Sequence, residues 1–78
     1  MVESYILIKT DPGTVGDAIK AVSAVEGVKS AHAVTGPYDI ISFAEAPDFN
    51  SLGSLVVAKI QKTAGVSSTL TCLVVELD

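Results

Sequence analysis

Stretches with strand-like spacing and stretches with helix-like spacing of apolar residues alternate along this chain in one order. Four stretches rich in β-branched and aromatic residues, 3–9, 28–35, 39–46 and 66–77, have the composition of strands and are bounded by turn residues. Apolar residues recur at helical spacing between the first and second of these stretches, and again between the third and fourth. The predicted order of elements is strand, helix, strand, strand, helix, strand.

The two predicted helices have recognisable ends. The first is expected at residues 13–25, with Thr14 or Asp11 as N-cap and Gly27 as the stop. The second begins after Asp48, a favourable N-cap residue, and ends near Thr63. Each helix has an apolar stripe to bury: Val15, Ala18, Ile19, Val22 and Val25 in the first, and Phe49, Leu52, Leu55, Val56 and Ile60 in the second.

This order of elements leaves few folds open to so short a chain. With 78 residues, the chain is predicted to be a single domain spanning residues 1–78. The βαββαβ order is that of the ferredoxin-like α+β fold. In that fold, a four-stranded antiparallel sheet carries two helices on one face. The short segment 36–38 makes the second and third strands a hairpin.

The predicted strands carry more apolar surface than two helices can cover. In the first strand, Ile6 and Ile8 fall on one face, while Tyr5 and Leu7 fall on the other. A sheet face exposed to water would alternate apolar with polar residues. The share of hydrophobic residues, 49%, is also high for a monomer of this size. We therefore expect the face without helices to pack against a second copy about a two-fold axis, forming a dimer.

Charge and residue content exclude several classes of function. The net charge is −4 and all five basic residues are lysines, which disfavours binding to nucleic-acid phosphates or to an anionic membrane surface. The single cysteine, Cys72, cannot form an internal disulfide, and one histidine is too few for a structural zinc site. No apolar run reaches the roughly 20 residues that span a bilayer. We expect a cytoplasmic protein that needs no cofactor and binds neither nucleic acid nor membrane.

Two turns beside apolar strands offer polar groups for a small-molecule site. In segment 34–39, Gly36 can take a positive φ angle and Asp39 places a carboxylate at the start of the next strand. In the last strand, Thr69 and Thr71 fall on one face and can form a polar wall. By residue type alone, an aspartate in a turn and threonines in a strand are more often structural.

His32 is the remaining candidate for chemistry. Histidine is the side chain that most readily exchanges a proton near neutral pH. No nucleophile with an orienting acid and no paired carboxylates accompany it in the sequence. A structural or interface histidine therefore fits better, and Cys72 is expected to be an inert buried thiol.

Several residues together give the chain a family resemblance. It resembles the effector domain of the leucine-responsive regulatory protein/AsnC family of transcription regulators through the pattern Val28-x-x-Ala31-x-x-Val34-Thr35-Gly36-x-Tyr38-Asp39, followed by Ile60-x-x-x-x-Gly65-Val66-x-x-Thr69-x-Thr71. This domain is called RAM, for regulation of amino acid metabolism. The resemblance covers essentially the whole chain and depends on both motifs together.

The resemblance implies partners and a site. Full-length family members carry a DNA-binding helix-turn-helix ahead of this domain, whereas here Met1 stands just before the first strand, as in stand-alone members. It implies dimers formed through the sheets, further assembly into octamers as tetramers of dimers, and an amino-acid effector bound between dimers. The ligand-binding residues that carry over are Thr35, Gly36, Tyr38, Asp39, Ser67, Thr69 and Thr71.

Three functions remain open at this point. The preferred one is an amino-acid-binding regulatory domain, not an enzyme, that modulates transcription regulators by changing its own assembly or by joining full-length relatives. The alternative is a small dimeric ferredoxin-like enzyme of the monooxygenase or isomerase type, with His32 or Tyr5 transferring a proton in the cavity between sheet and helices. The third is a purely structural oligomerisation module.

Overall fold

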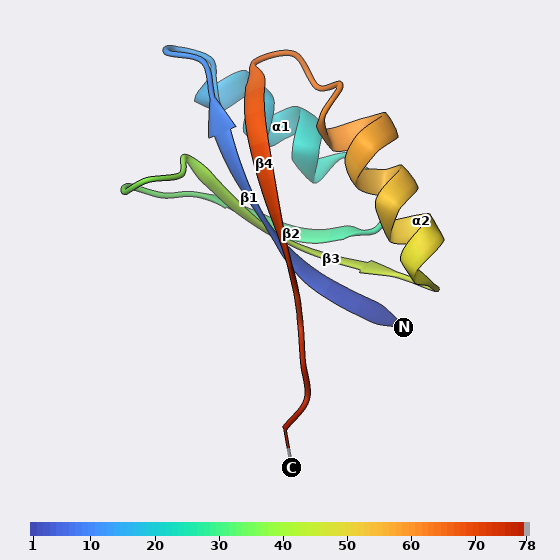
Figure 1. Cartoon of the computed structure of the whole chain (residues 1–78). Helices are drawn as coiled ribbons and strands as arrows, with labels where there is room; N and C mark the ends of the chain where they lie inside the picture. Colours follow the sequence, from blue (N-terminus) through green and yellow to red (C-terminus); the bar gives the residue numbers. More distant parts are fainter. Residues whose placement is uncertain (78) are drawn as a thin grey trace.

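The computed structural model describes residues 1–77, which form one antiparallel sheet with helices on one face (Figure 1). The order of the strands across the sheet is β2-β3-β1-β4. The ferredoxin-like α+β fold is therefore confirmed. The elements are β1 (Val2–Thr10), α1 (Val15–Ser23), β2 (Val28–Ala33), β3 (Ile40–Ala46), α2 (Phe49–Ser54), its π-helical continuation η1 (Leu55–Ile60), and β4 (Val66–Leu73).

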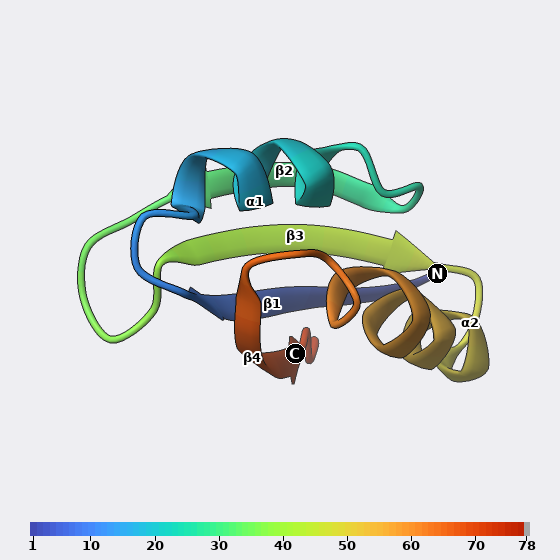
Figure 2. The same cartoon turned by 90° about the horizontal axis from the view of Figure 1, so that it is seen from above.

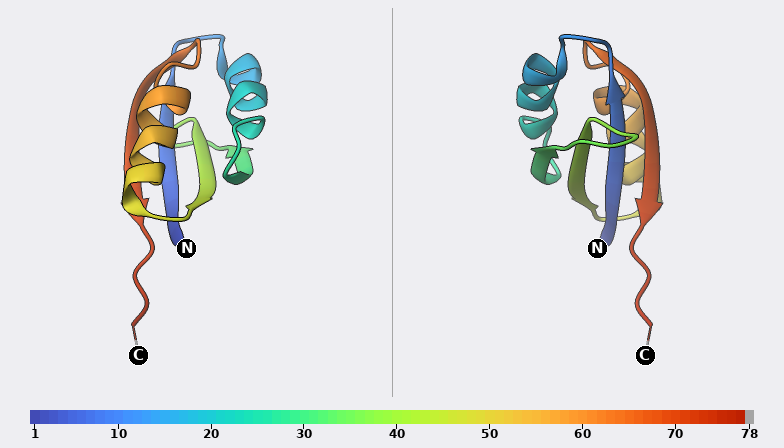
Figure 3. Two further views of the ribbon diagram at one scale, coloured as in Figure 1. Left: turned by 90° about the vertical axis from the view of Figure 1, so that its right-hand side faces the viewer. Right: turned by 90° about the vertical axis from the view of Figure 1, so that its left-hand side faces the viewer.

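The core lies between the sheet and the helices, which Figure 3 shows on the same side of the strands. The register pairs Ile8 with Ile40 and Ile6 with Ser42 across β1 and β3. Residues directly opposite each other share a face, so these side chains all point toward the helices. The two central strands and both apolar helix stripes supply the buried apolar residues Ile6, Ile8, Ala18, Val22, Ile40, Ala44, Ala46, Leu52, Leu55, Val56 and Ile60.

The two helix starts differ in how well the sequence predicted them. Asp48 is the N-cap of α2, and its carboxylate accepts a hydrogen bond of 2.7 Å from the Ser51 backbone N–H. This bond to the charged form holds the pKa of Asp48 below its usual value. Thr14 occupies the N-cap position of α1, but its hydroxyl donates to the Asp11 carbonyl instead of accepting from the helix. Only the Asp48 cap is thus made by its side chain.

Several predicted boundaries were too generous. The helix predicted at 13–25 is confined to Val15–Ser23, and the second helix ends at Ile60 instead of near Thr63. The hairpin strands end at Ala33 and restart at Ile40, so the connecting loop is longer than the predicted turn. Phe49, assigned to the buried stripe, is 66% exposed because it lies in the first turn of α2, beside the end of β4.

The apolar pattern of the last strand predicts that it continues to Leu77. In the structure β4 ends at Leu73. Its partner is β1, and Leu73 already pairs with Ser4 near the beginning of that strand. One further bond joins the Val74 N–H to the Glu3 carbonyl at 2.9 Å. Residues 74–77, called the arm below, then run away from the domain past the N-terminus (Figures 1 and 3).

The sheet face opposite the helices is apolar, as predicted from both strand patterns. Tyr5 pairs with Phe43 and with Cys72 on the two neighbouring strands. The rings of Tyr5 and Phe43 contact each other with centroids 5.0 Å apart. Tyr5 and Leu70 are about half exposed, and Cys72 is exposed instead of buried as expected. The thiol belongs to this open face because its parity on β4 is that of Leu70 and not that of the buried side.

Candidate functional site

The predicted ligand loop is attached to the end of β1 through Asp39. Its Oδ2 atom accepts hydrogen bonds from the Thr10 backbone N–H at 2.8 Å and from the Thr10 hydroxyl at 3.2 Å. The Asp39 N–H in turn donates to the Ile8 carbonyl at 2.9 Å. Asp39 is therefore a structural anchor between β1 and β3. Its second oxygen, Oδ1, accepts no hydrogen bond from any of residues 1–77 and can face a ligand.

The second predicted turn closes on the same end of β1. The Asp11 N–H donates to the Gly65 carbonyl at 2.8 Å, and Gly65 has a φ angle of +90°. A Cβ atom at Gly65 would lie 2.8 Å from the Thr14 hydroxyl, so this turn closely approaches the turn that follows β1. This end of the sheet, with the turns that follow β1 and precede β3 and β4, is called the turn end below.

Lys9 joins the two predicted halves of the site. Its carbonyl accepts a hydrogen bond of 3.1 Å from the Ser67 hydroxyl, and its ammonium lies 5.7 Å from the centroid of the Tyr38 ring. This distance is within the range of a cation–π contact. Tyr38 and Ser67, far apart in the sequence, thus meet on one exposed lysine. Sequence reasoning missed Lys9, whose role depends on the spatial meeting of three segments.

The rest of the loop is open to solvent. Thr35 and Gly36 are exposed, and Gly36 has the predicted positive φ, at +124°. Among residues 1–77, no atom outside the glycine and its two chain neighbours lies within 4 Å of a Cβ atom placed at Gly36. The loop projects away from both helices (Figures 1 and 2), and the N–H groups of Thr35 and Gly36 donate to no other backbone group among residues 1–77.

Thr69 and Thr71 lie on one face, as predicted, but that face is turned toward the helices. Thr69 pairs with the buried Ile8 and accepts a hydrogen bond of 3.1 Å from the Gln61 side-chain amide, just after η1. Thr71 pairs with Ile6 and is exposed at the sheet edge. Within one copy of the chain, these hydroxyls are separate from the contacts that Lys9 makes.

The two proton-transfer candidates lie outside any cavity between sheet and helices. Tyr5 and His32 both have the parity of the open face, where Tyr5 packs on Phe43 and His32 pairs with Ile41 at the sheet edge. The placement assumed in the enzyme alternative was therefore wrong. Among residues 1–77, no group of three or more His, Cys, Asp or Glu side chains can hold a metal ion. Nor is any helix in this part of the chain long and apolar enough to cross a membrane.

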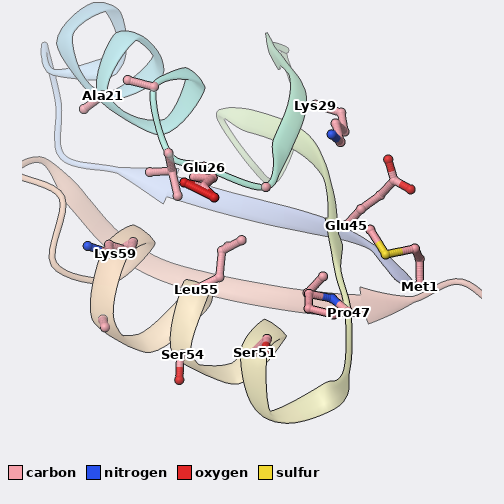
Figure 4. Close-up of a pocket in the computed structure, with 15 residues that line it drawn as sticks. Met1, Ala21, Glu26, Lys29, Glu45, Pro47, Ser51, Ser54, Leu55 and Lys59 are labelled. Atoms are coloured by element: carbon pink, nitrogen blue, oxygen red, sulfur yellow. The ribbon is translucent and has the colours of Figure 1, made fainter.

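A groove of about 730 Å³ lies between the helices at the end of the sheet opposite the turn end (Figure 4). Leu55 points into it from η1, and Glu26 faces it from the segment after α1 (Figure 4). Lys29 and Glu45 stand at its rim. None of the predicted ligand residues lines this groove. The groove is wide open and has charges of both signs, so its shape alone assigns it no ligand.

Comparison with known proteins places this geometry in a family. The model of the Lrp/AsnC ligand binding domain matches residues 3–77. Among curated proteins, homocitrate synthase of Sulfurisphaera tokodaii is 36% identical over 76 residues, which are 96% of this chain and 16% of the synthase. The chain therefore spans about a sixth of the length of the curated relatives it matches.

Solved structures share the fold. A Thermus thermophilus protein is 27% identical, with a TM-score of 0.93 over 100% of this chain and 98% of the other. A Neisseria meningitidis transcriptional regulator, solved with L-Met, is 19% identical, with a TM-score of 0.86 over 96% of this chain and 50% of the regulator. The second likeness is one of fold. With the family model matched along almost its whole length, the chain belongs to the Lrp/AsnC ligand-binding domain family.

Proposed function

We propose that this domain binds a free amino acid at the turn end and acts as a regulatory effector module. The meeting of Tyr38 and Ser67 on Lys9 carries this proposal, because it brings both family motifs to one lysine. Membership of a ligand-binding family supports it. So does the regulator of the same fold that was solved with L-Met.

The groups at the turn end match the two charges of an α-amino acid. The free Oδ1 atom of Asp39 can accept from the ligand's ammonium group. The Lys9 ammonium and the exposed N–H of Gly36 can hold its carboxylate. Lys9 supplies the cation in a chain whose basic residues are all lysines. Asp39 then has two roles, since its other oxygen keeps the loop on Thr10.

A second copy would complete the site. Thr35 and Gly36 are exposed on a projecting loop, and Thr69 and Thr71 share none of the contacts of Lys9 in one copy. A ligand held between two pairs of chains can contact the loop of one copy and the threonine hydroxyls of another at once. The enclosed site would also strengthen the charged contacts of the ligand. Pairing through the open face around Tyr5 and Phe43 is the expected first step of this assembly.

A thermal-shift screen against the twenty amino acids tests the binding proposal. A ligand present at 100 times its Kd stabilises the native state by about 2.7 kcal/mol. The variants Asp39→Asn and Lys9→Gln should each abolish the shift, because each removes one charge that faces the ligand. Asp17→Asn and Lys20→Gln, which change exposed charges on α1, are the matched controls and should retain it.

A shift that survives both Asp39→Asn and Lys9→Gln would place the ligand elsewhere and overturn the site. A protein that no amino acid stabilises at millimolar concentration would leave the oligomerisation module as the better account. The mass of the protein in solution, recorded with and without a stabilising amino acid, measures whether the ligand acts through assembly. A ligand that contacts two pairs of chains favours the larger species.

The downstream partner can be sought in two classes. Joining with full-length family regulators is the first candidate, because the shared domain offers the same interface. The match to part of homocitrate synthases favours a second, in which such a domain controls a biosynthetic enzyme. A pull-down with one full-length protein of each class, with and without the bound amino acid, separates the two. If neither protein is recovered, the regulatory effect of the domain would be restricted to its own self-assembly.

A further inference from the structure

The second helix changes its hydrogen-bonding pattern where α2 continues into η1. The Gln61 N–H bonds to the Val56 carbonyl, five residues back, at 2.8 Å. In an α-helix it would bond to the carbonyl four residues back. The π-helical turn therefore holds one extra residue, which rotates the residues after it by about 100° relative to an uninterrupted α-helix. Turns of this kind are rare and are found frequently at functional sites.

The extra residue decides which side chain faces the sheet. Ile60, five residues after Leu55, is fully buried, whereas Lys59, four residues after it, is exposed. Residues four apart share a face in an α-helix, so an uninterrupted α-helix would direct Lys59 toward the sheet. It would also turn Gln61 away from β4. The π turn thus gives Gln61 an orientation that an α-helix does not provide.

Both ends of the π turn are held by contacts outside it. At its start, the Leu55 side chain packs over Gly27, where an added Cβ atom would lie 2.6 Å from the Leu55 Cδ1 atom. Just after its end, the Gln61 side-chain amide donates to the Thr69 hydroxyl at 3.1 Å. The rotation of the turn is therefore fixed at one end by the segment after α1 and at the other by β4.

The bond from Gln61 determines what the Thr69 hydroxyl can do. A hydroxyl group has one proton to donate and two lone pairs that accept. The Gln61 amide uses one lone pair, and no side chain or carbonyl among residues 1–77 accepts the Thr69 proton. That proton is available to an oxygen of a ligand, such as the carboxylate of an amino acid.

We infer that the π turn positions the ligand site: it sets Gln61 against β4, and Gln61 in turn makes the Thr69 hydroxyl a donor. The inference rests on the proposed amino-acid site, to which Thr69 contributes. None of the residues Leu55–Ile60 belongs to the predicted ligand set, so the effect of the turn reaches the ligand through Gln61. Gln61 is a positioning residue and needs no contact of its own with the ligand.

The orientation of Gln61 can be measured without a ligand. The chain contains one glutamine and one asparagine, so the side-chain amide signals in a nitrogen–proton correlation NMR spectrum belong to Gln61 and Asn50 alone. Lys59→Ile combined with Ile60→Lys keeps the composition and places the apolar residue where an uninterrupted α-helix buries it. We expect the Gln61 signals of this double variant to move to the position of a free glutamine side chain, while those of Asn50 stay.

Deletion of Ala58 is the matched control for the double variant. It also removes the extra residue from the turn, but it keeps Ile60 and Gln61 in the same rotation relative to α2. The Gln61 signals should therefore remain where they are in the unaltered protein. Unmoved Gln61 signals in a double variant that circular dichroism shows to be folded would overturn the inference.

Gln61→Glu tests the direction of the hydrogen bond. A carboxylate of the same shape only accepts, so the Thr69 proton would turn to it and away from the ligand. In a thermal-shift titration with the amino acid that stabilises the unaltered protein, we expect about tenfold weaker binding. Urea unfolding without ligand should be unchanged because Gln61 is exposed. Asn50→Asp, the same amide-to-acid change at an exposed position of α2, should retain full binding.

The screen against the twenty amino acids completes the test. The double variant should lose the thermal shift, and the Ala58 deletion should keep it. Full binding by Gln61→Glu, or by the folded double variant, would overturn the inference. If no amino acid stabilises the unaltered protein, the binding proposal and this role fail together. Gln61 signals that still move in the double variant would then show that the failure lies with the ligand and not with the placement of Gln61.

Discussion

The two ends of the sheet use opposite chemistry. At the turn end, the polar side chains of Thr10, Asp39 and Ser67 are bonded to neighbouring segments, and these bonds hold the loops in place. At the other end, Phe49 and the arm expose apolar side chains, with one backbone bond from Val74 to the strand beneath. An end made rigid by its own hydrogen bonds suits a small polar ligand. An end that leaves apolar groups uncovered suits another protein surface.

The largest effect is expected where the turn end is most crowded. Gly65→Ala adds a Cβ atom 2.8 Å from the Thr14 hydroxyl at a φ of +90°. We expect it to lower the free energy of unfolding by about 2–4 kcal/mol in urea denaturation. Gly36→Ala, with φ also positive but open space around it, should cost less, about 1–2 kcal/mol. Equal losses would mean that the close approach to Thr14 adds nothing.

The second-largest effect is expected at Asp39, which anchors the turn end. Asp39→Ala leaves the Thr10 N–H and hydroxyl without their acceptor, so we expect a loss of about 1–3 kcal/mol in the free energy of unfolding. Asp39→Asn keeps an oxygen acceptor and should lose less. Asp11→Ala, an exposed neighbour bonded only through its backbone, is the control. If Asp39→Ala unfolds at the same urea concentration as this control, the anchoring role is wrong.

Two buried serines sharpen the comparison in the middle of the sheet. Ser42 donates to the Ile6 carbonyl at 3.0 Å, whereas Ser4, nearer the arm, is fully buried with no hydrogen-bond partner among residues 1–77. Ser42→Ala should therefore destabilise the domain by about 1 kcal/mol. Ser4→Ala should stabilise it by a similar amount, because it removes an unpaired buried hydroxyl. Thermal unfolding of the two variants should shift in opposite directions, and a shift in the same direction contradicts this account.

The smallest effect concerns pH at the start of α2. The hydrogen bond from the Ser51 N–H lowers the pKa of folded Asp48, so the charged form is favoured by folding. Its contribution to stability is complete above the pKa of the unfolded chain and is lost as pH falls through the lower folded pKa. Unfolding measured from neutral to acidic pH should show a slightly smaller loss for Asp48→Asn than for the unaltered protein. Identical profiles would remove this role.

Local patterns predicted the order of the elements and the two-sided apolar sheet, because periodicity is a property of neighbouring residues. Other features depended on distant segments. The end of β4 depends on where β1 begins, since Leu73 meets Ser4 there. The π-helical turn from Leu55 to Ile60, in which the Gln61 N–H reaches back to the Val56 carbonyl, has no signature in spacing.

The predicted site residues show the same limit. Strand parity correctly placed Thr69 and Thr71 on one face, but which face the helices cover is a property of the whole fold. The turn composition pointed to Asp39, yet its partner Thr10 lies 29 residues away in sequence. Lys9 carried no signal because its contacts come from a loop and a strand that meet it only in the folded chain.

The positions of the two tyrosines also give the protein built-in optical reporters. The chain has no tryptophan and two tyrosines, so its near-ultraviolet absorption and emission come mainly from Tyr5 and Tyr38. One ring packs on Phe43 in the open sheet face, and the other lies beneath Lys9 at the turn end. Replacing either with phenylalanine leaves a single fluorophore at the remaining surface. Self-association and ligand binding can then be followed separately without an attached dye.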